Sequence, residues 1–287
     1  MSHRDAPQDR SGEAQGEAGK SAAERDATRH RAATMTSEPP SVIYEAIRQT
    51  GAQELARGAL ALWWSGVAAG VAISLSVICK GFFVAVLPQA DWVPAVSNLG
   101  YAVGFLVVIL GRMQLFTENT ITPILQLFLD PSRAGLWCTA RLWAIVFAAN
   151  LTGCAVAAVL LVVVGIVPDP QMAGIMEVAR KYAELTPVEH LIHGMPAGFL
   201  IASLVWILPR LTGAGEVMAI LIVTYMIGLG HLSHVVAGAT DLFVLVLAGE
   251  VGPGPAAAAI AASLVGNIVG GTGMFAALTY AQVRQEL

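Results

Sequence analysis

The chain has 287 residues, of which 56% are hydrophobic and only 13% charged, and its mean hydropathy is +0.67. This composition is typical of an integral membrane protein and excludes an ordinary soluble domain. The formal net charge of −4 gives no indication of a nucleic-acid partner.

The chain divides by composition into three parts. Residues 1–40 mix acidic and basic side chains with Gly, Ser and Ala and contain almost nothing apolar to bury, so we expect a disordered cytoplasmic tail. Residues 41–58 have helical periodicity and mixed polarity, which predicts an amphipathic helix along the membrane surface. Residues 59–283 are predicted to form a six-span transport domain.

Six apolar segments in this domain are each close to the ~20 residues that a membrane span needs. They cover approximately residues 59–86, 95–129, 136–165, 189–208, 215–249 and 255–281. The second and fifth are too long and contain polar residues, which predicts that helices 2 and 5 are broken. The basic residues between spans favour cytoplasmic termini in a bacterial-type inner membrane, and only Arg180 and Lys181, in the longest loop, oppose this orientation.

The two halves of the domain repeat each other weakly. "GVAAG" from Gly66 in span one corresponds to "GMPAG" from Gly194 in span four, and such small-residue motifs let helices approach closely. "NLTG" from Asn150 corresponds to "NIVG" from Asn267, an offset of 117 (267 − 150) that also sets Thr117 against His234. Because each half has three spans, the sequence predicts an inverted 3+3 repeat with a site near the midplane between discontinuous helices.

The polar residues in the two breaks are the candidate functional groups. Thr117 or Asn119 is suited to cap a restarting half-helix. Intramembrane charges usually pair, which predicts an ion pair between Arg112 and Glu118 that stabilises the first break. In the second break, His234 changes easily between neutral and cationic forms, so it could give a proton to a passing weak-acid anion.

Several of these motifs together resemble the formate/nitrite transporter family over roughly residues 40–283. They are "LFTEN" from Leu115, "SHVVAG" from Ser233, "NLTG" and "GNIVGG". The resemblance implies an all-α, aquaporin-like protomer of six transmembrane helices, a homopentamer, and a separate pore in each protomer for small monovalent anions such as formate, nitrite or hydrosulfide. The chain departs from the family pattern at Ser233, immediately before the histidine, and at Gly238, four residues after it.

Carried over by position, His234 is the central pore histidine and Thr117 the polar residue that faces it. The resemblance further implies that the pore is lined or narrowed by Tyr101, Leu115, Phe116, Ile227, Asn150 and Asn267. Of the remaining polar residues, we expect His231 to pack, Lys80 to snorkel to the interface, and Asp241 to have no transport role. The expected partners are small anions, protons, the bilayer and further copies of the chain.

Other functions remain open from the sequence. A neutral small-solute or water pore would use the same architecture without a proton donor, and a non-transporting structural or regulatory membrane protein is a third reading. An enzyme is not predicted, because the adjacent Ser233 and His234 would point about 100° apart on a helix. The three cysteines lie in apolar runs without metal-ligand spacing, so neither a cofactor nor a metal is expected.

Overall fold

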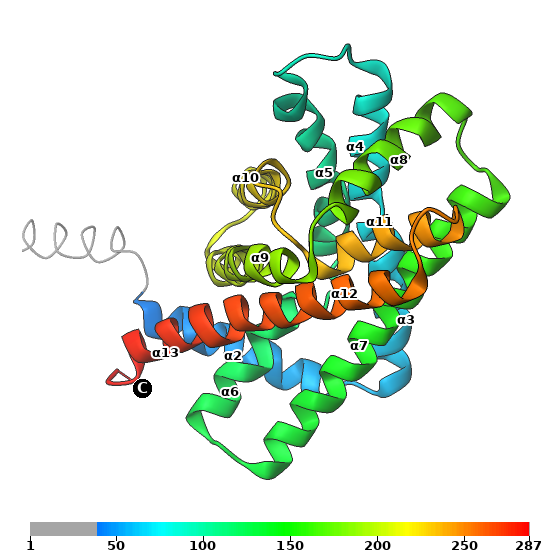
Figure 1. Cartoon of the computed structure of the whole chain (residues 1–287). Coiled ribbons are helices and arrows are strands. Elements are labelled where there is room, and N and C mark those ends of the chain that lie inside the picture. Colours follow the sequence, from blue (N-terminus) through cyan, green and yellow to red (C-terminus); the bar gives the residue numbers. More distant parts are fainter. Residues whose placement is uncertain (1–38, 287) are drawn as a thin grey trace, which may run out of the picture. The chain divides into compact units, whose positions relative to one another are not determined.

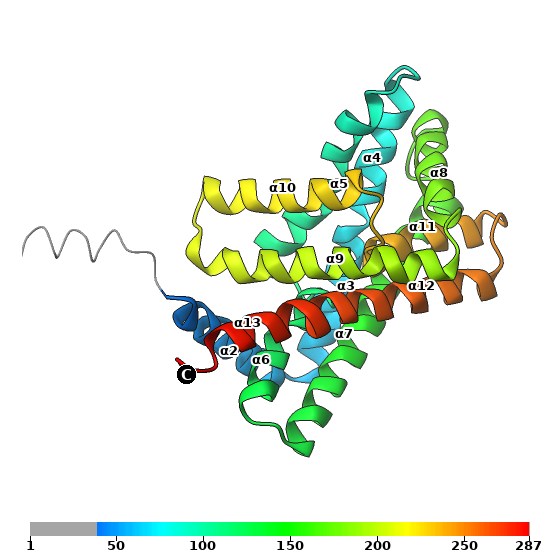
Figure 2. The same ribbon diagram turned by 60° about the vertical axis from the view of Figure 1, so that its left-hand side comes forward.

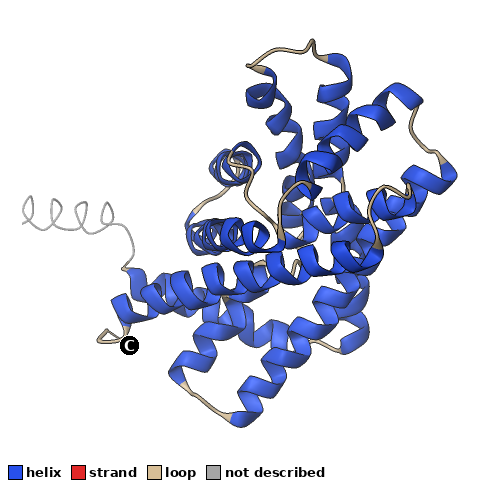
Figure 3. Ribbon diagram, in the orientation of Figure 1, coloured by secondary structure: helices blue, strands red, loops and turns tan. Residues whose placement is uncertain are grey.

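The computed structural model describes residues 39–286, and every regular element among them is a helix (Figure 3). Almost all of the predicted tail therefore lies outside the described residues. The helices, of which the α-helices are labelled in Figure 1, are α2 (Pro40–Ala56), α3 (Ala59–Ile73), α4 (Leu75–Val86), α5 (Val93–Leu110), η1 (Glu118–Thr120), α6 (Thr122–Leu129), α7 (Arg133–Val159), η2 (Leu160–Val164), α8 (Asp169–Ala183), α9 (Pro187–Ile207), η3 (Leu208–Arg210), α10 (Ala214–Leu229), α11 (Val235–Leu247), α12 (Pro253–Ile268), η4 (Val269–Ala276) and α13 (Ala277–Val283).

The six predicted spans are present, and the second and fifth are broken as expected. In the described residues, five helical segments are long and apolar enough to cross a membrane: Ala59–Val86, Val93–Leu110, Arg133–Val164, Pro187–Arg210 and Pro253–Val283. The fifth span is divided into the shorter α10 and α11. The second continues after its break as the eight-residue α6.

The longest loop differs from the expectation, because α8 fills most of it. Asp169 lies in the first turn of α8, and Arg180 and Lys181 lie in the last. These charges complement the helix dipole at both ends. The buried face of α8 packs against α4 and α11, which brings its C-terminal residues beside the break in span five.

The inverted repeat is visible as two equivalent helix pairs, α3 with α7 and α9 with α12; Figure 2 shows the second pair side by side. A Cβ atom on Gly70 would lie 2.1 Å from the carbonyl oxygen of Asn150, and one on Gly198 would lie 2.2 Å from the carbonyl oxygen of Asn267. Only glycine allows this approach. Each glycine contact thereby holds an asparagine beside a break.

Helix α2 is anchored to the second half of span two. The hydroxyl of Tyr44 donates a hydrogen bond of 2.6 Å to the carbonyl of Leu125 in α6. Ile43 and Ile47 are buried in a cluster that also includes residues of α6, α9 and the C-terminal helix. A helix is therefore present at the predicted position, and its apolar side packs on protein; that it lies along the membrane surface stays a prediction.

Candidate functional site

Two buried asparagines hold the two helix breaks. The side-chain oxygen of Asn150 accepts from the backbone N–H of Phe116 at 2.9 Å, and its amide donates to the carbonyls of Gly66 and Gln114 at 2.8 and 2.9 Å. Asn267 does the same in the other half. It accepts from Val235 N–H at 2.9 Å and donates to the carbonyls of Gly194 and Ser233 at 2.9 and 2.7 Å.

These bonds satisfy backbone groups that the breaks expose, which is a requirement inside a membrane. Both asparagines are fully buried. The resemblance implied that they line the pore, but every side-chain N or O atom of the pair is committed to backbone. In the described structure they therefore act as clamps on the breaks.

The breaks themselves are related by an offset of 119, so the offset of 117 applies to the helices that carry Asn150 and Asn267 and not to the breaks. Arg112 and His231, which are 119 residues apart, have positive φ angles of 48° and 50°. Asn150 binds the backbone of Gln114 and Phe116, and Asn267 binds the backbone of Ser233 and Val235, which again lie 119 residues later in the chain. By this register the structural counterpart of His234 is Leu115. Thr117 and His234 are therefore opposed in space without being equivalent in the repeat.

The side chains of His234 and Thr117 contact each other, as expected, and their pore role stays a prediction. The distance from the imidazole Nε2 to the Thr117 hydroxyl oxygen is 2.8 Å, and both residues are fully buried. The His234 Nδ1 accepts the backbone N–H of Ala237 at 3.2 Å and caps α11. Since a backbone N–H can only donate, Nδ1 carries no proton, and the neutral ring donates to Thr117 through Nε2–H.

The first break lacks an equivalent cap. Neither η1 nor α6 has a side-chain cap, so the prediction that Thr117 or Asn119 caps a half-helix is wrong. Asn119 instead donates to Gln114 across the break at 3.1 Å, and the Trp143 indole donates to the Asn119 carbonyl at 2.8 Å.

Aromatic rings lead from one side to the central pair. The ring centroids of Tyr101 and Phe105 are 5.5 Å apart. The ring centroids of Phe105 and His234 are 4.8 Å apart, and these two rings have a T-shaped geometry. Phe105 is a residue that sequence reasoning missed, since nothing in the apolar run marks it. Leu115 is fully buried, and Phe116 packs against Trp143 and Phe147 of α7.

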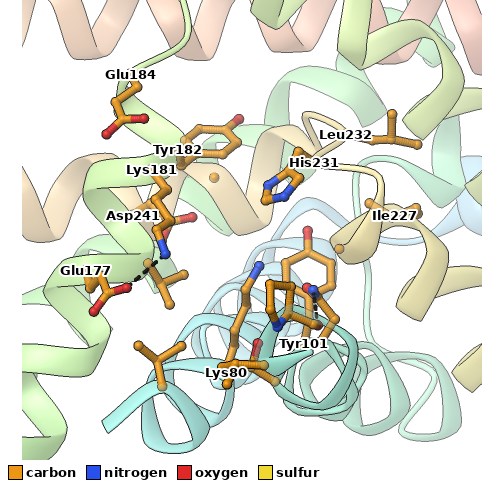
Figure 4. Close-up of a pocket in the computed structure, with 18 of the residues that line it drawn as sticks. Lys80, Tyr101, Glu177, Lys181, Tyr182, Glu184, Ile227, His231, Leu232 and Asp241 are labelled. Carbon is orange, nitrogen blue, oxygen red and sulfur yellow. Dashed lines mark hydrogen bonds and ion pairs between the residues drawn. The ribbon is translucent and has the colours of Figure 1, made fainter. Parts of the chain in front are cut away.

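A cavity of about 470 Å³, here called the vestibule, lies on the Tyr101 side of this column (Figure 4). Tyr101 and Ile227 line it; that they narrow a pore at this point stays a prediction. The vestibule extends to the turn between α4 and α5. This turn follows the C-terminal end of span one, whereas α2 precedes its N-terminal end. Its polar lining comprises Lys80, Gln89, Ser97, Asn98, Tyr101, Glu177, Lys181, Tyr182, Glu184, His231 and Asp241.

Two of the expectations for these polar residues, those for Lys80 and His231, are corrected here. Lys80 does not reach away toward the interface; its ammonium nitrogen lies 5.7 Å from the centroid of the Tyr101 ring. His231 lines the vestibule because its backbone, at positive φ, leaves the helix there. Asp241 lines the vestibule too, while remaining only 4% exposed.

The predicted ion pair between Arg112 and Glu118 is not formed. The ion pairs among the described residues are Glu45–Arg48, Arg180–Glu250 and Glu177–Lys181. Arg112 is exposed at the positive-φ turn, whereas Glu118 begins η1 and is half-buried.

The carboxylate that does reach the first break comes from α2. Glu54 accepts from the hydroxyl of Thr122 at 2.5 Å and from the amide of Gln114 at 3.2 Å. Burial raises the pKa of Glu54, and these two donors partly oppose that increase. No cluster of three or more His, Cys, Asp or Glu side chains within residues 39–286 is arranged to hold a metal.

Comparisons with known proteins agree with this geometry. Residues 41–281 match the family model described as formate/nitrite transporter. The chain belongs to the formate/nitrite transporter family. A curated relative, the inner membrane protein YfdC of Escherichia coli (strain K12), is 35% identical over 246 residues, which cover 85% of this chain and 79% of that protein.

Two solved structures share the fold. An "FNT family ion channel" superposes with a TM-score of 0.74 at 18% identity, covering 84% of this chain and 99% of that one. A "pentameric formate channel with formate bound" gives a TM-score of 0.66 at 18% identity, covering 79% and 98%. By its family membership the chain is a non-enzymatic membrane channel or transporter for small anions, and the two structures show that it has the formate/nitrite transporter fold.

Within this family fold, the departure at Gly238 has a steric explanation. A Cβ atom on Gly238 would lie 2.1 Å from the Tyr182 hydroxyl and 2.0 Å from the adjoining ring carbon. The Tyr182 hydroxyl and Ser263 share a hydrogen bond of 3.1 Å. The ring of Tyr182, delivered by α8, therefore occupies the space that a side chain at position 238 would fill.

Proposed function

We propose that the protein passes small monovalent weak-acid anions of the formate, nitrite or hydrosulfide type, with proton exchange at His234. The observation that carries this proposal is the His234–Thr117 contact of 2.8 Å, which lies behind Tyr101 and Phe105 as seen from the vestibule. We further propose a homopentamer in the bacterial inner membrane with cytoplasmic termini, so that the vestibule faces the periplasm. The solved formate channel is described as pentameric, which supports the homopentamer. YfdC is described as an inner membrane protein, which supports the location in the inner membrane.

The energetic reason for proton exchange is the cost of a bare charge in the membrane. Insertion scales give about 2.5 to 3.5 kcal/mol for a charged side chain at the bilayer centre, which corresponds to roughly a hundredfold in rate. The apolar faces of Tyr101, Phe105 and Ile227 do little to reduce that cost. An acid that accepts one proton avoids it, whereas chloride has no comparable neutral form.

The geometry sets a condition on how His234 takes part. A neutral ring with Nδ1 bound to Ala237 N–H can donate a hydrogen bond through Nε2, but it is a poor proton donor. Forming the imidazolium requires Nδ1 to release the cap of α11, at a cost of about 0.5 to 2 kcal/mol. The free energy of charging a fully buried ring is added to this cost, and an anion held beside His234 would offset it.

The decisive experiment measures formate and nitrite flux into proteoliposomes across pH. We expect flux to rise as pH falls, because the neutral acid becomes more abundant. His234→Asn is the sharpest variant, because Asn can cap the helix but cannot carry a proton. It should lower formate flux by about a hundredfold and flatten the pH profile; flux unchanged from the unmodified protein would reduce His234 to a helix cap.

A neutral-solute pore is the second candidate, and the neutral state of His234 favours it. The groups at the centre are all uncharged, so an uncharged solute meets no electrostatic barrier there. This alternative predicts osmotic swelling of vesicles that is insensitive to pH and unchanged in His234→Asn. Formate flux that depends on pH and on His234 would exclude it as the main activity.

A further inference from the structure

Asp241 and Lys80 stand out among the vestibule residues, because an acidic and a basic side chain line one cavity without forming an ion pair. Lys181, the other lysine there, is bound to Glu177 at 2.8 Å, and Figure 4 shows it turned toward that carboxylate. No ion pair in the described part of the chain includes Lys80 or Asp241. One Asp241 carboxyl oxygen is buried and has no hydrogen-bond partner there.

An unpaired buried carboxyl in an anion pathway needs an explanation. As a carboxylate it would repel the anion that Lys80 attracts. As a carboxylic acid it becomes a hydrogen-bond and proton donor for that same anion. Lys80 beside Tyr101 and Asp241 on α11 both line the cavity at the approach to the constriction, so an anion held by the ammonium group lies in the same chamber as this donor.

We propose that Lys80 and Asp241 form a loading site, at which Lys80 holds the incoming anion and the Asp241 carboxyl group gives it a proton. The O–H bond of the carboxyl breaks and a new bond forms between the proton and the anion. The neutral acid moves past Tyr101, and the carboxylate left behind regains a proton from the water of the vestibule. This inference rests on the proposed function, and it makes Asp241 a proton donor in addition to His234.

The titratable groups around Asp241 come from several elements. Lys80 faces it from α4, Tyr101 from α5, Cys154 from α7, and Lys181 and Tyr182 from α8. Glu177, Glu184 and His231 line the same cavity. Of the other helices packed against α11, the helices α3, η2 and α12 contain no titratable residue.

The test compares Asp241→Asn with Glu250→Gln in proteoliposomes. The second variant also removes one carboxylate, but from the ion pair with Arg180 outside the vestibule. We expect Asp241→Asn to lower formate and nitrite flux at neutral pH at least tenfold and to flatten its pH dependence. Glu250→Gln should stay within twofold of the unmodified protein. Lys80→Gln should raise the formate concentration that gives half-maximal flux.

An infrared difference spectrum gives a second reading that does not depend on flux. Adding formate to the unmodified protein should perturb a protonated-carboxyl band that is missing from Asp241→Asn. If the unmodified protein transports formate but Asp241→Asn keeps its rate and pH profile, the loading site is refuted while the proposed function stands. If no anion is transported but the band responds to formate, the proposed function fails and the site is supported; a silent band without transport refutes both.

Discussion

Asn267→Ala should destabilise the protein strongly, because one side chain holds three backbone groups at the second break. The variant leaves the N–H of Val235 and the carbonyl of Ser233 without partners, whereas Gly194 lies inside α9, whose helix supplies another donor. Each buried unsatisfied group costs about 1 to 3 kcal/mol, so the free energy of unfolding should fall by about 4 kcal/mol. At about 2 to 4 °C per kcal/mol, the melting temperature should fall by roughly 8 to 16 °C.

The assay is thermal unfolding of the purified protein in detergent, followed by tryptophan fluorescence. Asn150→Ala should behave alike, since it clamps the other break with the same bonds. Asn98→Ala is the matched control: Asn98 is also fully buried, but its amide bonds only to Pro94 of its own helix and its oxygen has no partner among the described residues. If both clamp variants melt within the range of Asn98→Ala, the clamp interpretation is wrong.

Two further predictions concern helix packing and pH. Gly198→Ala places a methyl group 2.2 Å from the carbonyl oxygen of Asn267, where backbone must move, so the detergent-purified variant should lose its single gel-filtration peak. Gly254→Ala, with nothing within 4 Å, should elute like the unmodified protein, and the same elution by Gly198→Ala would refute the packing argument. Burial raises the pKa of Glu54, so the folded state binds more protons than the unfolded state above about pH 4.3, and stability should fall as pH rises through the raised pKa. Melting temperatures recorded from pH 4 to pH 8 should therefore decrease with pH in the unmodified protein and not in Glu54→Gln. The same slope of melting temperature against pH in both proteins would contradict this prediction.

Much of the architecture could be read from local patterns. An apolar run of membrane length identifies a span wherever it occurs, and a polar group within such a run identifies a break, because unsatisfied backbone is tolerated at that depth only inside protein. The opposition of His234 and Thr117 was also predicted. The repeat offset that suggested it was inexact, since the backbone of the breaks follows an offset of 119.

The errors concern pairs of residues whose distance depends on how helices pack. Arg112 and Glu118 are close in sequence, but the positive φ at Arg112 and the start of η1 at Glu118 leave them unpaired. Glu54 reaches the same break from α2, which no local pattern indicated.

The sequence by itself determined the membrane class, the six spans and the two breaks, because hydrophobic length and intramembrane polarity are properties of contiguous segments. Only the tertiary structure decided that Asn150 and Asn267 clamp the breaks, that Tyr182 fills the space beside Gly238, and that Lys80 and Asp241 share a cavity. Those relations join helices far apart in the chain. They depend on close glycine-mediated contacts and on the placement of α8, which no single segment encodes.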